Sequence, residues 1–289
     1  MKKHILTHCI GTYNNLNYLK IAVESVRKNS YFKDAPFVIH AENCTDGTNE
    51  WLENNHSRFN LEVYTEKDTY PNVKGIGGSM NFCADKVQTK FINFLHSDFY
   101  VTKDWDIRLL EVHEKYPKEK LWVNSFRVEP NMFNSPDRVG TALVPPDAFG
   151  GYWNTFDASR FEEWATQLKE MNPNTEIPKG EGVSGLIRKD VWDEVGGNDP
   201  RFAPASWDDH DLFLRMLQQN IRFVMPTKSV VWHFGARGSH RLEENNGQSS
   251  ERQVKAEREN IKKWLEKWGR LPKFDSYGMI CGLVGKEIL

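Results

Sequence analysis

Cysteine is scarce in this sequence, and the few cysteines present form no recognisable pattern. Among the 289 residues, Cys9, Cys44, Cys83 and Cys281 lie far apart and make no CxxC pair. A disulfide scaffold and a thiolate zinc site are therefore not expected. A reducing cytosol is the compartment that this cysteine usage predicts.

Long apolar runs are absent as well. No run reaches the ~18 residues typical of a membrane-spanning helix. Residues 1–13 contain no long apolar segment followed by a cleavage site, so we expect a first strand there rather than a signal peptide. The tail at residues 278–289 is apolar but short. We expect it to pack on the body of the protein, with peripheral attachment to a membrane as the alternative.

Neither sign of charge dominates. The chain has 38 basic and 40 acidic residues, a formal net charge of −2, which excludes a globally basic surface for nucleic acid. A local basic patch involving Arg237, Arg241 and the lysines around Lys262 stays open. Hydrophobic residues make up 39% and charged residues 27%, values that exclude a disordered or fibrous chain.

The first half of the chain alternates β-like runs with amphipathic helical stretches. Apolar residues at positions 16, 19, 23 and 26 share one helical face, and Asp46 is predicted to cap a second helix. This alternation predicts an α/β fold with a mostly parallel sheet whose ligands bind at the carboxyl ends of the strands. The expected strands are residues 5–11, 36–40, 61–64 and 91–95.

The second half is less regular at first. Residues 130–180 are rich in proline and aromatic residues and predict a long, weakly regular connection that carries functional loops. Regular structure is expected again as a helix around residues 209–219, a strand at 229–233 and a charged helix at 251–268.

Three segments could carry chemistry. Asp98 follows an apolar strand, where a carboxylate could hold a divalent cation or simply form a turn. Asp208, Asp209 and Asp211 open a helix, either as capping residues or as a site with an ionised general base. His233 ends a short strand, and the arginines after it could close over phosphate or belong to a solvated loop.

In chain order, these segments resemble the family 2 glycosyltransferases, which have the GT-A fold. His96-Ser-Asp98 stands in the place of the family's metal-binding Asp-x-Asp, and Trp207-Asp-Asp209 in the place of its Glu-Asp. The segment Trp232-His-Phe-Gly235 resembles the family's segment around a metal-ligand histidine near the end of the domain. The remaining resemblance lies in residues 10–14, 41–48, 77–81 and 184–202.

The resemblance implies a role for each matching position. Asp98 and His233 would bind Mn²⁺ or Mg²⁺ on the diphosphate of a nucleotide-sugar donor, and Asp209 would deprotonate an acceptor hydroxyl. The implied donor-binding residues are Gly11, Thr12, Tyr13, Glu42, Gly78, Asn81, His96, Ser97, Gly185, Arg237 and Arg241. The implied acceptor-binding residues are Trp153, Trp207 and Asp208.

Two positions depart from the family pattern. His96 replaces the first Asp of Asp-x-Asp and could be a second metal ligand or a hydrogen-bond donor. Glu42 replaces the usual Asp, which leaves the base open among UDP-, GDP- and dTDP-linked donors. A mixed nitrogen and oxygen ligand set suits manganese somewhat better than magnesium.

The expected protein is an inverting, metal-dependent glycosyltransferase with a GT-A fold and a C-terminal helical extension. Residues 1–125 would form the donor-binding half of one domain, residues 126–245 its acceptor-binding and catalytic half, and residues 246–289 a helix and tail packed on the body. The acceptor could be a glycan, a lipid-linked saccharide, a protein or a small molecule, with a hydroxymethylated DNA base as the last alternative. A nucleotidyltransferase and a non-catalytic nucleotide-sugar-binding module remain as other classes.

Overall fold

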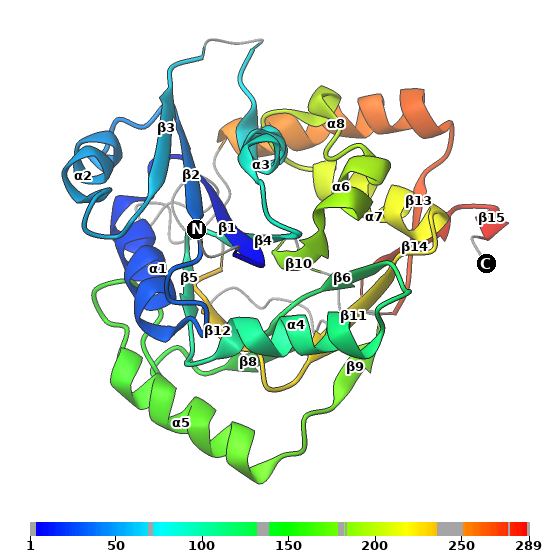
Figure 1. The fold of residues 1–289 in the computed structure, drawn as a ribbon. Helices are drawn as coiled ribbons and strands as arrows, with labels where there is room; N and C mark the ends of the chain where they lie inside the picture. The colour runs from blue at the N-terminus through cyan, green and yellow to red at the C-terminus, as the bar shows by residue number, and fades with distance from the viewer. Residues whose placement is uncertain are drawn as a thin grey trace.

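A large mixed sheet forms the centre of the protein (Figure 1). The computed structural model describes residues 4–68, 72–131, 139–178, 182, 184–235, 251–276 and 278–287. Within these ranges the sheet has eight strands in the order β3-β2-β1-β4-β10-β6-β11-β9. They are β1 Leu6–Thr12, β2 Phe37–Glu42, β3 Glu62–Glu66, β4 Phe91–His96, β6 Leu121–Val123, β9 Glu176–Pro178, β10 Gly185–Arg188 and β11 Arg222–Pro226.

Parallel pairing dominates the first half of this sheet. Strands β3, β2, β1 and β4 are all parallel, as the alternation of strands and helices predicts. Strand β10 runs antiparallel to both of its neighbours, β4 and β6. The first residues of β10 therefore lie at the same edge as the last residues of β4.

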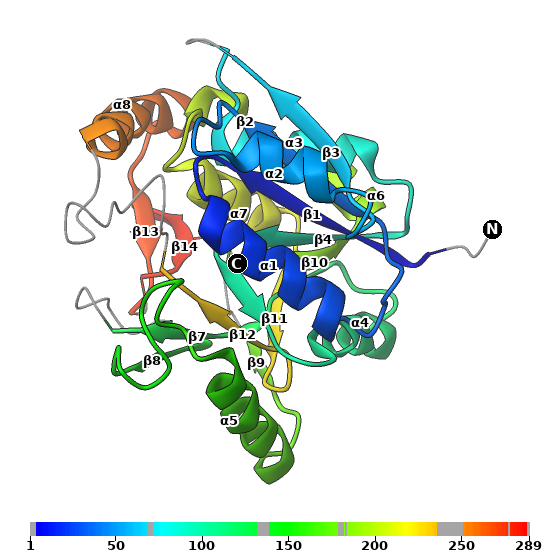
Figure 2. The ribbon, with the colours of Figure 1, turned by 90° about the vertical axis from the view of Figure 1, so that its left-hand side faces the viewer.

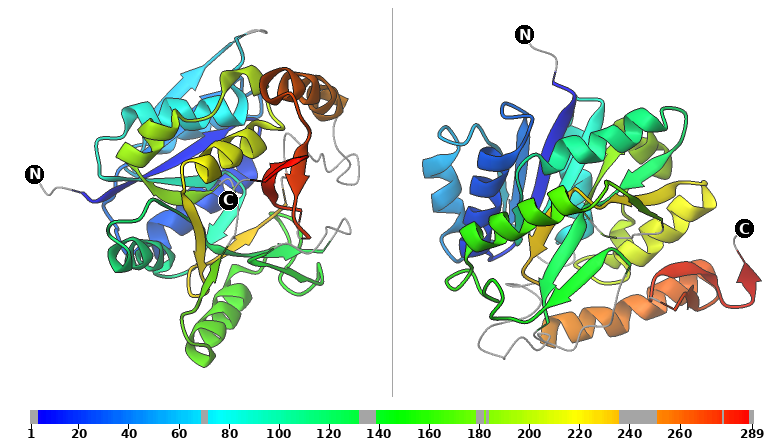
Figure 3. Two further views of the ribbon diagram at one scale, coloured as in Figure 1. Left: turned by 90° about the vertical axis from the view of Figure 1, so that its right-hand side faces the viewer. Right: turned by 90° about the horizontal axis from the view of Figure 1, so that it is seen from below.

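Helices cover both faces of the sheet. One face packs against α1 (Leu16–Asn29), α2 (Thr48–Asn55) and α4 (Trp105–Lys115), and Figure 2 shows α1 and α2 on this side. The other face packs against α3 (Gly75–Lys86), α6 (Lys189–Val195) and α7 (Asp208–Gln218), seen in the left view of Figure 3. Successive side chains of β4 point to opposite faces of the sheet. Phe91 and Leu95 therefore pack in the core on the α1 side, and Ile92 and Phe94 pack in the core on the α3 side.

A second sheet lies beside the first. Among the described residues it has four strands in the order β5-β12-β7-β8, namely β5 Phe99–Val101, β12 Val230–His233, β7 Phe126–Pro130 and β8 Thr141–Val144. Its core is aromatic and includes Tyr100, Phe149, Phe161 and Trp232. This sheet brings the end of β12 next to the turn that follows β4.

Two expectations about local structure were wrong. The stretch 130–180 contains a 14-residue helix, α5 (Ala158–Met171), which packs Phe161 into the aromatic core of the second sheet. Asp46 is not the N-cap of α2: Gly47, in a left-handed conformation, takes that position. The Asp46 carboxylate instead accepts hydrogen bonds from the backbone N–H groups of Thr48 and of Leu16 at the start of α1.

The C-terminal residues pack on α7. Helix α8 (Glu251–Trp268) is followed by a hairpin-like sheet of β13 (Pro272–Phe274), β14 (Ile280–Leu283) and β15 (Lys286–Glu287). The buried Asp211 carboxylate of α7 accepts a hydrogen bond from Trp268 Nε1 at 2.9 Å and pairs with Lys267 Nζ at 2.5 Å. None of the helices in the described ranges is long and apolar enough to cross a bilayer.

Candidate active site

The carboxyl ends of β2, β1 and β4 meet at one edge of the large sheet. Gly11 of β1 is in register with His40 on one side and His96 on the other. A Cβ atom at Gly11 would lie 2.6 Å from Cβ of Ser79 in α3, so glycine is required for the close approach of that helix. Gly185 begins β10 opposite Phe94, close to the same edge. The fold therefore brings several of the predicted donor-binding residues together.

Three side chains converge at this edge. His96 ends β4, Asp98 lies in the turn before β5, and His233 ends β12, which pairs with β5 at Phe99. One ligand atom from each of the three lies within 4.8 Å of the others. The Nε2 atom of His233 is 3.5 Å from Oδ2 of Asp98, and Nδ1 of His96 is 3.9 Å from Oδ1 of Asp98. Two imidazoles and one carboxylate are a donor set that can hold a divalent metal ion.

The electrostatics of His233 fit a cation at this point. Burial alone would lower the pKa of His233, but the carboxylates of Asp98 and Glu129 raise it to about 9. Nε2 is buried and makes no hydrogen bond within the described part of the chain. The site thus favours positive charge, which a metal ion can supply in place of the proton.

Two contributors to this site were missed from the sequence. Oε1 of Glu129, in β7, lies 2.8 Å from Nδ1 of His233. Asn15 donates a hydrogen bond from Nδ2 to Oγ of Ser97 at 2.8 Å, between two strand-end loops. The signal for Glu129 was a pair of alternating charged residues, Arg127 and Glu129, in an otherwise apolar strand.

Glu42 caps helix α3. Its Oε1 accepts from the backbone N–H of Lys74 at 2.6 Å, and its Oε2 accepts from that of Gly75 at 2.9 Å. Both bonds satisfy amides that the first turn of a helix leaves unpaired. A carboxylate has further acceptor positions, so its predicted contact with a nucleobase stays a prediction.

Asn81 and Gly78 serve packing around α3. Asn81 donates from Nδ2 to the carbonyl of Asn198 at 2.9 Å and accepts from the backbone N–H of Asn198 at 2.8 Å. An amide group has a second N–H and a second lone pair, so the predicted contact of Asn81 with the sugar donor stays a prediction. A Cβ at Gly78 would lie 2.7 Å from Cβ of Lys74, and one at Gly185 would lie 2.9 Å from Cε2 of Trp122.

The start of α7 is strained and holds two unlike carboxylates. Ser206 and Trp207 have φ of 74° and 71°, a conformation that costs a non-glycine residue about 1–3 kcal/mol and that clusters at functional sites. Asp208 is buried beside Gly77, and its burial, followed by the charge of Asp209, raises its pKa to about 7. The Asp209 side chain is 34% exposed and accepts from the N–H of His210. Asp209 is therefore the more accessible of the two carboxylates.

Aromatic rings from two parts of the chain meet at His210, the residue that follows Asp209. The ring of His210 lies 5.6 Å from Trp207 and 5.2 Å from Phe274 of β13. Phe274 is 39% exposed. We call Trp207, His210 and Phe274 the aromatic shelf. His210 and Phe274 were not predicted as site residues, because only the packing of the C-terminal strands on α7 brings them together.

Three further predicted residues lie in a connection between elements or outside the described ranges. Trp153 is 40% exposed in the connection between β8 and α5. Arg237 and Arg241 fall outside the described residues.

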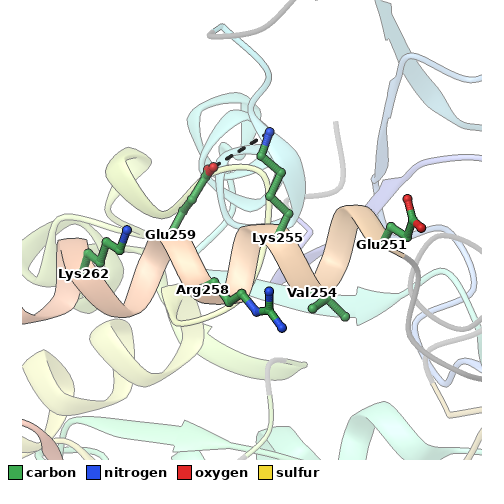
Figure 4. Close-up of a pocket in the computed structure, with 6 residues that line it drawn as sticks. All are labelled: Glu251, Val254, Lys255, Arg258, Glu259 and Lys262. Atoms are coloured by element: carbon green, nitrogen blue, oxygen red, sulfur yellow. Dashed lines mark ion pairs between the residues drawn. The ribbon is translucent and has the colours of Figure 1, made fainter.

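A groove on α8 carries charges of both signs, whereas a nucleic-acid-binding patch needs mainly basic residues. It is lined by Glu251, Val254, Lys255, Arg258, Glu259 and Lys262 (Figure 4). Nζ of Lys255 lies 4.0 Å from Oε1 of Glu259. Charges of both signs alternate on this face, so Lys262 belongs to a mixed surface rather than to a basic stripe.

Residues 7–194 match the model of Glycosyl transferase family 2. This match covers more than half of the chain, and the protein belongs to that family. No curated protein matches the sequence.

Solved structures define the fold as GT-A. GalNAc-T7, crystallised with UDP, GalNAc and Mn²⁺, superposes with a TM-score of 0.62 at 17% identity, over 96% of this chain and 49% of its own. TarS from S. aureus superposes with a TM-score of 0.56 at 14% identity, over 80% of this chain and 36% of its own. A TarS fragment, residues 1–349 in complex with UDP, gives 0.50 at 15% identity, over 78% of this chain and 60% of the fragment. The chain thus spans less than two thirds of each of these proteins.

Proposed function

We propose that this protein is an inverting, metal-dependent glycosyltransferase that moves a sugar from a nucleoside-diphosphate sugar to an acceptor hydroxyl. The observation that carries this proposal is the convergence of His96, Asp98 and His233 at the carboxyl edge of the sheet. Membership of family 2 supports the reaction class.

His96, Asp98 and His233 would hold the divalent cation, and their two nitrogens and one oxygen favour Mn²⁺ over Mg²⁺. When bound, such a cation neutralises negative charge on the departing diphosphate. Glu42 and Thr12, at the ends of β2 and β1, would contact the nucleoside end of the donor. UDP is the first nucleotide to test, since it is bound in the TarS and GalNAc-T7 structures.

Asp209 is the proposed general base. Its carboxylate is partly exposed, whereas the neighbouring Asp208 is buried, and burial raises the pKa of Asp208. An acceptor hydroxyl beside Asp209 would lose its proton to this carboxylate as it attacks the anomeric carbon. Attack from the face opposite the diphosphate inverts the anomeric configuration. The aromatic shelf would contact the apolar face of the acceptor.

The proposal is tested first by donor binding. UDP-, GDP- and dTDP-sugars are added with and without Mn²⁺, and a donor that binds the folded state raises the melting temperature. Release of nucleoside diphosphate is then measured with Mn²⁺ for the wild type, Asp209→Asn and a matched control, Asp193→Asn, whose carboxylate is exposed and pairs with Lys189.

The expected result is Mn²⁺-dependent release that Asp209→Asn lowers by at least ~100-fold while donor binding and the control are unchanged. Release of pyrophosphate would instead indicate a nucleotidyltransferase. Donor binding with no release, and no effect of Asp209→Asn, would indicate a non-catalytic module.

A further inference from the structure

We propose that Glu129 is a positioning residue that sets the metal affinity of the site through His233. This inference rests on the proposed function, because it concerns the same cation. It adds a residue that would not coordinate the cation itself and that lies outside the short motifs on which the resemblance to the family was based.

The register of the second sheet places the two side chains together. Strands β12 and β7 are parallel, with Val231 opposite Arg127 and Trp232 opposite Val128. The next position along both strands brings His233 beside Glu129, and Oε1 of Glu129 lies 2.8 Å from Nδ1 of His233. The side chains are 10% and 5% exposed, so water screens this contact little.

This contact determines which nitrogen of His233 faces the cluster. A carboxylate at Nδ1 accepts the N–H of that nitrogen, so the lone pair of the neutral ring resides on Nε2. Nε2 is the atom that lies 3.5 Å from Asp98. A carboxylate behind a metal-bound imidazole also increases the basicity of the ring and fixes its orientation.

Glu129 also adds charge without occupying a coordination position. Together with Asp98 it places two carboxylates against His233. Two such charges favour a dication strongly in a low-dielectric site. Removal of the Glu129 charge should therefore weaken cation binding even though the three ligands are intact.

The test is a titration of Mn²⁺ followed by electron paramagnetic resonance, with and without UDP. The variants are Glu129→Gln, which removes the charge, Glu129→Ala, which also removes the acceptor, and Glu129→Asp as the conservative rescue. Glu119→Gln is the control, since Glu119 is exposed and pairs with Arg222 away from the cluster. Melting of the metal-free proteins reports whether each variant folds.

We expect Glu129→Gln to weaken Mn²⁺ binding about 10- to 100-fold, Glu129→Ala to weaken it at least as much, and Glu129→Asp to restore part of the affinity. Wild-type Mn²⁺ affinity in folded Glu129→Gln and Glu129→Ala, with a change only in metal-free stability, would overturn the inference. That result leaves the proposed function standing if Asp98→Asn abolishes binding. Absence of Mn²⁺ binding by the wild type with and without UDP would overturn both.

Discussion

The Nε2 atom of His233 lies 3.5 Å from Oδ2 of Asp98, although the two residues are far apart in the sequence. His233 ends β12, and Asp98 lies in the turn before β5. Antiparallel pairing of β5 with β12 at Phe99 and His233 brings them together. With His96, at the end of β4 in the large sheet, the two residues form one cluster. The proposed binding of the cation, and with it of the donor diphosphate, depends on this contact.

Asp98→Asn should weaken Mn²⁺ binding more than any change at Glu129. The amide keeps the shape of the side chain but loses the negative charge that a hard cation prefers. Because changes to outer-shell partners already cost about 10- to 100-fold, we expect at least ~100-fold here. Calorimetric titration with Mn²⁺ in the presence of UDP measures it. Equal affinities for Asp98→Asn and Asp193→Asn would contradict the assignment.

Asp208→Asn should flatten the dependence of stability on pH. The folded-state pKa of Asp208 is raised to about 7, so its favourable contribution is complete below the unfolded value near 3.8 and is lost as pH rises through 7. At ~1.4 kcal/mol per pKa unit, the wild type should lose a few kcal/mol relative to the variant between pH 4 and pH 8. Urea unfolding at several pH values checks this. A constant difference between the two proteins would show that Asp208 titrates normally.

Phe274→Ala should weaken acceptor binding and leave the donor unaffected. Loss of one ring contact on the aromatic shelf removes ~0.5–1.5 kcal/mol, equivalent to an increase of about 2- to 12-fold in acceptor KM. Steady-state kinetics with varied acceptor and varied donor separate the two effects. Val284→Ala is the control, since Val284 is 54% exposed in the same C-terminal region. An unchanged acceptor KM would remove Phe274 from the site.

Lys267→Ala should destabilise the protein more than Lys255→Ala. Lys267 is 16% exposed and pairs with both Asp199 and the buried Asp211, so its loss leaves buried negative charge less compensated. The expected cost is on the order of 1–3 kcal/mol, because Arg215 still pairs with Asp211. Lys255 is 77% exposed, and its pair with Glu259 should contribute ~0–1 kcal/mol. Equal unfolding midpoints in urea would contradict this account of how α8 is held.

The sequence indicated the parallel half of the large sheet because its signals are local. Apolar runs near residues 6–12, 37–42 and 91–96 alternate with amphipathic helices, and chain direction then follows from the connection rule. Asp98, Asp209 and His233 could be selected for the same reason, since each stands at the end or start of a regular element.

The parts that were missed depend on contacts between distant segments. Glu129 meets His233 only because β7 pairs with β12, and Phe274 meets His210 only because β13 packs on α7. Helix α5 was obscured by the prolines and glycines on either side of it. The cap of α2 was displaced by one residue because Gly47 adopts a left-handed conformation that suits glycine.

Crystals grown with Mn²⁺ and UDP provide the most direct measurement. We expect one anomalous manganese peak within bonding distance of His96, Asp98 and His233, next to the diphosphate. A bound UDP whose manganese lies elsewhere, with these three side chains uncoordinated, would contradict the account.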